Sequence, residues 1–197
     1  MRAFLFKHSA NTVTIVGIIL AAWANMLMWN YQDLGLVLAL TLAVAATDLA
    51  DGRIARRWKI VTLEGISLDR ARDKAFMVPM FFFFCKDLWL GEGIVFAFIK
   101  AMLVLILLTE GGLVISWVVG LRRGFDVSAH RAGKIKQTIY FVIVCLWLLV
   151  RLVEQKSAFR SGLVSALVLS FLLLLAAIYA LKSLIGYLER YAKGPPG

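Results

Sequence analysis

The sequence contains few residues of the kinds that bind soft metals or interrupt helices. It has two cysteines, two histidines and three prolines among 197 residues. Cys85 and Cys145 lie inside apolar runs, and no CxxC or Cys/His spacing accompanies them, so nothing indicates a zinc or redox centre. Acidic residues are scarce as well, 12 against 22 Lys and Arg. Any clustering among so few acids is therefore informative.

Apolar residues dominate the chain instead. They make up 61% of it, and the mean hydropathy is +0.84. Soluble domains are about 45–50% apolar, so part of this surface must face something other than water. A helix needs about 20 apolar residues to cross a bilayer. We therefore predict an all-α, polytopic membrane protein with six transmembrane helices, in which residues 1–197 form a single transmembrane domain.

Six apolar runs carry that prediction. The first continues through Trp29, which is too long for a cleavable signal peptide, so we expect a retained helix. The second and third helices should extend beyond the bilayer, because Ala, Leu, Arg and Lys dominate their charged ends. Residues 1–10 are a candidate interfacial segment, and the tail 194–197 should be disordered. The predicted spans are 12–29, 34–50, 74–90, 94–119, 135–150 and 161–188.

The net charge of +10 fits a membrane protein better than a nucleic-acid-binding one. No basic helix or aromatic RNA-binding signature accompanies the charge. Most Lys and Arg fall at the two termini and in the segments 53–74 and 122–136, which would all lie on one side of six spans. The positive-inside rule places that side in the cytoplasm. The basic residues of the segment 151–160 are the exception.

Four of the seven aspartates fall within 26 residues: Asp48, Asp51, Asp69 and Asp73. The first two are three residues apart and the last two are four apart, so on helices each pair shares a face. Sequential antiparallel helices would bring the pairs together just inside the cytoplasmic interface. Four converging carboxylates repel unless cations neutralise them, and hard ions such as Mg²⁺ or Mn²⁺ prefer oxygen ligands. Either pair alone would suit a solvated loop.

Residues between the two pairs suit phosphate binding. Gly52 lies one turn beyond Asp48 and leaves room for close approach of a ligand. Arg56 lies two turns beyond Asp48, where a guanidinium can bind a phosphate oxygen. Gly65 lies one turn before Asp69, the corresponding place on the facing helix.

The complete spacing resembles the signature of the CDP-alcohol phosphotransferase family. From Asp48 to Arg56 the chain reads DxxDGxxAR. Eight residues separate this part from the second part, which reads GxxxDxxxD from Gly65 to Asp73. Every fixed position of the signature is present, and eight specified residues at rigid spacing make a specific motif. Outside 48–73 the resemblance rests on helix count, loop charge and length.

The resemblance implies a fold, a reaction and roles for individual residues. A CDP-linked lipid such as CDP-diacylglycerol would give its phosphatidyl group to an acceptor hydroxyl and release CMP. One or two Mg²⁺ or Mn²⁺ ions would be held by Asp48, Asp51 and Asp69, with Asp73 as general base and possible further ligand. Gly52, Arg56 and Gly65 match positions that line the nucleotide site. The resemblance also implies a homodimer in a prokaryotic plasma membrane.

The second cytoplasmic loop bears on the acceptor. The sequence from Gly133 to Thr138 resembles the GKxKT element of phosphatidylglycerophosphate synthases, with Gln137 as an extra residue. A basic pocket favours a phosphorylated acceptor, so we rank glycerol 3-phosphate first, inositol phosphate second and phosphatidylglycerol, as in a cardiolipin synthase, third. The candidate ligands for the phosphate of the acceptor are Arg122, Arg123, Lys134 and Lys136.

One departure and one rival interpretation remain open. Phosphatidylglycerophosphate synthases often carry Arg-Glu late in the fourth span, where this chain has Thr109-Glu110. Glu110 is either a functional acid or a partnered structural one. Six helices with clustered carboxylates also suit a divalent-cation transporter, but transport sites usually lie near the bilayer midplane, whereas these aspartates lie at helix ends.

Overall fold

The computed structural model describes the backbone of residues 2–30, 33–57, 63–89, 91–125, 131–156 and 162–194. Six α-helices account for nearly all of these residues, and no strand occurs in the described ranges. The side chains at positions 2–11, 51–52, 54–56, 63–64, 66–67, 85, 87, 89 and 162–163 are outside the description. The all-helical prediction is therefore confirmed for the part of the chain that the structure describes.

The chain divides into two compact units. Unit 1 comprises Met1–Phe84 and Trp147–Ala158, and unit 2 comprises Cys85–Leu146 and Phe159–Gly197. Two helices, α3 (Leu63–Trp89) and α5 (Arg131–Lys156), each contribute residues to both units. That the whole chain is one catalytic domain stays a prediction.

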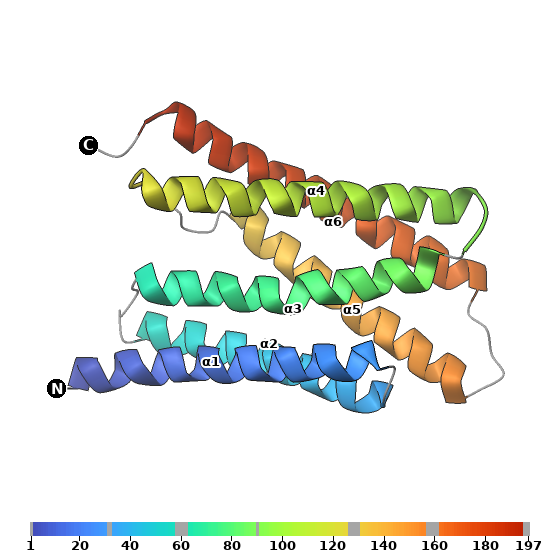
Figure 1. Cartoon of the computed structure of the whole chain (residues 1–197), viewed down its shortest axis with the longest axis horizontal. Helices are drawn as coiled ribbons and strands as arrows, with labels where there is room; N and C mark the ends of the chain where they lie inside the picture. Colours follow the sequence, from blue (N-terminus) through green and yellow to red (C-terminus); the bar gives the residue numbers. More distant parts are fainter. Residues whose placement is uncertain are drawn as a thin grey trace. The chain divides into compact units, whose positions relative to one another are not determined.

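In unit 1, α1 (Arg2–Trp29) and α2 (Leu34–Arg57) run side by side (Figure 1). The buried positions of α1 recur every three or four residues, the period of one helix face. Most of them are small, which lets neighbouring backbones approach closely, as is common between membrane helices. They are Thr14, Gly17, Ala21, Ala24 and Met28.

Most of α3, residues 63–84, also belongs to this unit. The Asn25 amide of α1 donates a hydrogen bond of 2.9 Å to the carbonyl oxygen of Ala75. The Trp29 ring stacks on Phe82 and meets Phe83 edge-on, with ring centroids 6.3 and 5.1 Å apart. Pro79 lies inside α3, which continues through it, as expected for a proline in an apolar helix. These contacts fix α3 against α1.

In unit 2, α4 (Ile94–Arg122) packs against α6 (Gly162–Ala192). Gly112 allows the close approach, because a Cβ there would lie 3.2 Å from Leu184 of α6. One turn further along α4, the Tyr191 hydroxyl donates to the carbonyl oxygen of Ser116. The Phe125 and Tyr191 rings lie 4.8 Å apart.

Four helical segments are long and apolar enough to cross a membrane: Thr12–Trp29, Ile94–Arg122, Arg131–Lys156 and Val164–Ala192. Leu34–Ala50 is a shorter apolar helix, and α3 is not among the candidates. Both α2 and α3 do extend into charged segments as predicted, α2 to Arg57 and α3 from Leu63. The protein is thus membrane-embedded by these four segments. That α2 and α3 cross the membrane as well stays a prediction.

Two terminal predictions have different outcomes. Residues 2–10 continue α1 rather than form a separate element, because nothing in that stretch breaks the helix. Their position at the membrane interface stays a prediction. Most of the tail, residues 195–197, lies outside the described residues.

Candidate metal and substrate site

The buried face of α2 ends in a carboxylate. Val37, Leu40, Thr41 and Val44 are buried, at intervals of three or four residues. The next position on that face is Asp48, one turn beyond Val44. The face that packs inside unit 1 therefore carries an acid at the end where α2 leaves the apolar segment Leu34–Ala50.

The corresponding face of α3 begins with charged residues and continues with large apolar ones. Phe76, Met80 and Phe83 are buried at helical spacing. Extending that spacing towards the start of the helix reaches Arg72 and then Asp69. The charged side chains of the earlier turns therefore lie on the same face of α3 as the apolar side chains that pack inside unit 1.

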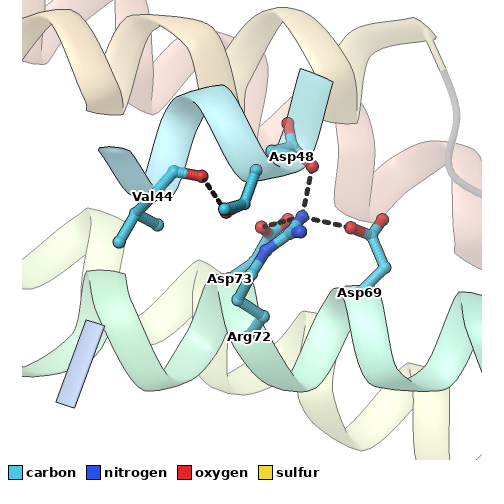
Figure 2. Close-up of polar contacts among 6 residues, drawn as sticks. Val44, Asp48, Asp69, Arg72 and Asp73 are labelled. Carbon is cyan, nitrogen blue, oxygen red and sulfur yellow. Dashed lines mark hydrogen bonds and ion pairs between the residues drawn. The ribbon is translucent and has the colours of Figure 1, made fainter. Parts of the chain in front are cut away.

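These two faces meet in a cluster of three carboxylates around one guanidinium (Figure 2). A single nitrogen of Arg72, Nη2, donates to Asp48 Oδ1 of α2 and to Asp69 Oδ1 of α3. The same nitrogen lies 3.6 Å from Asp73 Oδ1. Figure 2 shows the three carboxylates converging on the guanidinium from both helices.

The cluster has the chemistry of a site for a hard divalent cation. One oxygen from each of Asp48, Asp69 and Asp73 lies within 4.8 Å of the other two. The three carboxylate groups are 49%, 49% and 30% exposed, so an ion can reach them. Three acids exceed the single positive charge of Arg72, and an all-oxygen ligand set suits Mg²⁺ or Mn²⁺. The residues present therefore fit the predicted cofactor.

Asp73 differs from its neighbours in its tendency to hold a proton. Its partly buried position disfavours the charged form and, together with the nearby charges of Asp69 and Asp48, raises the pKa of Asp73 to about 7. Arg72 and Lys74 act in the opposite direction. A carboxyl group that titrates near neutral pH can accept a proton from a substrate hydroxyl.

The remaining predicted residues of this region are only partly described. Gly65 lies in α3, one turn before Asp69, and is partly buried. Asp51, Gly52 and Arg56 belong to α2, but their side chains lie outside the described residues. Their roles stay predictions.

The predicted acceptor-binding residues belong to unit 2 and differ among themselves. Arg122, Arg123 and Lys134 are exposed. Lys136, in contrast, is 5% exposed, and its ammonium donates to Glu110 of α4. The hydroxyl of Tyr140, which is also buried, donates to the same carboxylate oxygen over 3.0 Å. Of the two roles considered for Glu110, the partnered structural acid matches these contacts.

Arg72 belongs to the cluster but was not predicted as a site residue. It was included only among the basic residues of the segment 53–74. A signal for it exists: Arg72 lies three residues after Asp69 and four before Phe76, on the face that the aspartate spacing defines. An arginine between two site acids, in phase with an apolar face, was a candidate for an inward position.

A helical, membrane-embedded protein with a carboxylate cluster able to hold a divalent cation at a helix end belongs to the class of membrane enzymes and transporters that handle charged ligands. Comparison with family models selects among these. The chain belongs to the CDP-alcohol phosphatidyltransferase family, whose model matches residues 7–180. The match covers most of the chain, far beyond the signature, and confirms the predicted resemblance. No curated individual protein matches the sequence in a direct search.

Proposed function

We propose that this protein transfers the phosphatidyl group of CDP-diacylglycerol to the hydroxyl of a phosphorylated alcohol, glycerol 3-phosphate in the first instance, and releases CMP. Membership of the family supports phosphatidyl transfer from a CDP-alcohol. The observation that carries the proposal is the convergence of Asp48, Asp69 and Asp73 within 4.8 Å, at the end of the apolar part of α2.

In this proposal the carboxylates divide the work. Asp48, Asp51, Asp69 and Asp73 hold one or two divalent ions, and Asp73 also takes the proton of the acceptor hydroxyl. The acceptor oxygen then forms a bond to the phosphorus of the phosphatidyl group, while the bond from that phosphorus to the CMP oxygen breaks. A bound Mg²⁺ or Mn²⁺ would offset negative charge on the diphosphate and on the departing CMP. The raised pKa of Asp73 supports its role as base.

Gly52, Arg56 and Gly65 complete the proposed nucleotide site. The two glycines let the nucleotide approach the helix backbones, and Arg56 binds a phosphate oxygen. A lipid substrate could then keep its tails in the bilayer while its cytidine remains in water.

The proposed topology has six membrane crossings, with both termini and the site on the cytoplasmic side of a prokaryotic plasma membrane. The distribution of Lys and Arg supports this orientation. A homodimer is proposed from the family resemblance alone. Labelling of single cysteines placed near Lys193 and in the 91–93 turn, in intact cells and in permeabilised ones, tests the orientation.

For the acceptor, the exposed cations Arg122, Arg123 and Lys134 are the proposed phosphate ligands, and Lys136 contributes while paired with Glu110. Lys134→Ala should raise the KM for the acceptor several-fold more than the KM for the CDP-lipid. Equal increases in both would point to a general electrostatic role.

The direct experiment measures CMP release by purified protein with CDP-diacylglycerol and a panel of acceptors, in the presence of Mg²⁺ or Mn²⁺ and after their removal with EDTA. Glycerol 3-phosphate should support ion-dependent release. Activity with inositol phosphate or phosphatidylglycerol instead would identify a phosphatidylinositol-phosphate synthase or a cardiolipin synthase. Ion uptake into vesicles without CMP release would favour the transporter.

A further inference from the structure

The Arg72 side chain is buried inside unit 1, beside a glycine of α1. Its side chain is 1% exposed, although arginine is seldom fully buried. The methylene stem passes Gly17 of α1, where an added Cβ would lie 2.8 Å from Arg72 Cδ and 2.7 Å from Thr47 Oγ1. The Thr47 hydroxyl in turn donates to the carbonyl oxygen of Val44 over 2.7 Å, which holds the Thr47 side chain in place beside Gly17. The Arg72 side chain thus runs through the interior of unit 1, and its guanidinium reaches the carboxylates from the buried side.

We propose that Arg72 is the internal cation of this site, and that it competes with the divalent ion for the oxygens of Asp48 and Asp69. The proposal rests on the function proposed above, because it takes the three aspartates as ligands of that ion. It adds a role for a residue outside the eight fixed positions of the signature.

Competition follows from the contacts themselves. Nη2 of Arg72 contacts Oδ1 of Asp48 and Oδ1 of Asp69 at once, so one cationic nitrogen bridges two helices. A divalent ion that takes the same two carboxylates as ligands needs the region of space that this nitrogen occupies. Two cations held at such short range in a partly desolvated cluster repel strongly. Ion and guanidinium therefore cannot share the position.

The charge balance favours the exchange. Asp48, Asp69 and Asp73 carry three negative charges when ionised, and all three lie against the one guanidinium of Arg72. A guanidinium brings one positive charge to this cluster, whereas a divalent ion brings two. A divalent ion neutralises the three acids better than Arg72 does.

The consequence is a threshold for the divalent ion. Without the ion, Arg72 keeps three mutually repelling carboxylates together and the two helix ends in place. When the concentration of the divalent ion exceeds this threshold, the ion displaces the guanidinium from the oxygens of Asp48 and Asp69. Removal of its charge should therefore tighten ion binding and weaken the ion-free fold.

The experiment measures Mn²⁺ binding to the purified full chain in nanodiscs by electron paramagnetic resonance, with no substrate present. Arg72→Gln should lower the Kd for Mn²⁺ about tenfold or more, since it removes both the competitor and one positive charge. The matched control is Arg57→Gln, which removes a charge from the same unit. Arg57 is exposed and lies nine residues beyond Asp48, about two and a half turns, on the opposite face of α2. Its Kd should stay within about twofold of the wild type, as expected for an exposed, screened charge.

Three results would overturn the inference. An unchanged Kd in Arg72→Gln would mean that the guanidinium does not compete, and a higher Kd would mean that it helps to hold the ion. Either result would leave the proposed transferase intact. Absence of Mn²⁺ binding in the wild type and in both variants would instead remove the metal site itself, and the proposed mechanism with it.

A second measurement covers the case in which Arg72→Gln does not fold. Arg72→Lys keeps the charge and identifies, by loss of its signals, the guanidinium resonances of Arg72 in nitrogen-15 spectra of the wild type. Addition of Mg²⁺ should shift these resonances as the guanidinium leaves the carboxylates. Resonances that stay in place at saturating Mg²⁺ would contradict the exchange.

Discussion

Unit 1 and unit 2 each contain a cluster of ionised side chains, and the two clusters differ in charge balance. In unit 1, three carboxylates surround one guanidinium and stay 30–49% exposed. In unit 2, Glu110 accepts hydrogen bonds from the ammonium of Lys136 and from the Tyr140 hydroxyl. The side chains of Lys136 and Glu110 are only 6% and 12% exposed.

The two clusters therefore differ in whether a further cation would stabilise them. The balanced pair of unit 2 satisfies its charges internally and has no need of a further ion. The cluster of unit 1 has an excess of exposed carboxylates, so it gains by binding a cation from solution. Charge surplus and access, rather than the number of acids alone, distinguish the two.

The strongest contrast should be seen in turnover. Asp73→Asn should lower kcat about 10²- to 10⁴-fold, the usual contribution of a general base. Binding of the CDP-lipid should be largely kept, because the amide preserves the shape of the side chain. Glu110→Gln, the matched change in unit 2, should leave kcat within a few-fold. Near-normal turnover of Asp73→Asn in a single-turnover assay would remove it from the base role.

The reverse contrast is expected in stability. Lys136→Met leaves the buried carboxylate of Glu110 without its cation and should destabilise the protein by about 3–5 kcal/mol, as for other broken buried pairs. The double variant Lys136→Met/Glu110→Gln should recover most of this loss. Thermal unfolding in nanodiscs measures both. Equal instability of the single and double variants would show that the pairing itself contributes little.

Glycine substitutions test how tightly each unit holds its cluster. Gly17→Ala places a Cβ against Arg72 and Thr47 and should destabilise the protein by about 1–2 kcal/mol, the overpacking cost less the gain in helix propensity. Gly111→Ala in α4 is the control, since no heavy atom lies within 4 Å of an added Cβ there. Its unfolding temperature should not fall. A stable Gly17→Ala would mean that Arg72 moves aside at little cost.

The smallest expected effect is a pH dependence confined to unit 1. Burial and neighbouring acids raise the pKa of Asp73 to about 7, so this carboxyl is protonated below that pH and must lose its proton to bind a cation. The apparent affinity for Mn²⁺ should therefore fall by about tenfold per pH unit below 7 and level off above it. Asp73→Asn should flatten the profile. An affinity independent of pH between 5 and 7 would exclude Asp73 as an ion ligand.

Most of the helices were predictable from the sequence because apolar runs of bilayer length leave little choice of structure. The expected spans 12–29 and 34–50 lie within α1 and α2, and 94–119 within α4. The extension of α2 and α3 into charged segments, as from Leu63 to Asp73 in α3, was also predicted. Helical propensity carries the chain past the apolar boundary there, so hydropathy marks the membrane and not the helix.

The predicted acids also came together as their spacing indicated, at least for Asp48, Asp69 and Asp73. Lys136 shows the limit of that reasoning. Its motif and its place in a basic loop suggested a phosphate ligand, and that role stays a prediction. The sequence did not indicate that its side chain lies on the buried face of α5, one turn before Tyr140, and pairs with Glu110. A motif records residue types and intervals but not which face of the helix meets a neighbour.

The sequence by itself determined the helical class, the approximate spans, the family signature and the acids that converge, because each depends on composition or on intervals along one helix. Only the tertiary structure decided which cation two of the acids meet across helices: Arg72 for Asp48 and Lys136 for Glu110. Those pairings join residues 24 or 26 positions apart in the chain. They depend on where α3 lies against α2 and where α5 lies against α4, which is decided by packing contacts and not by order along the chain.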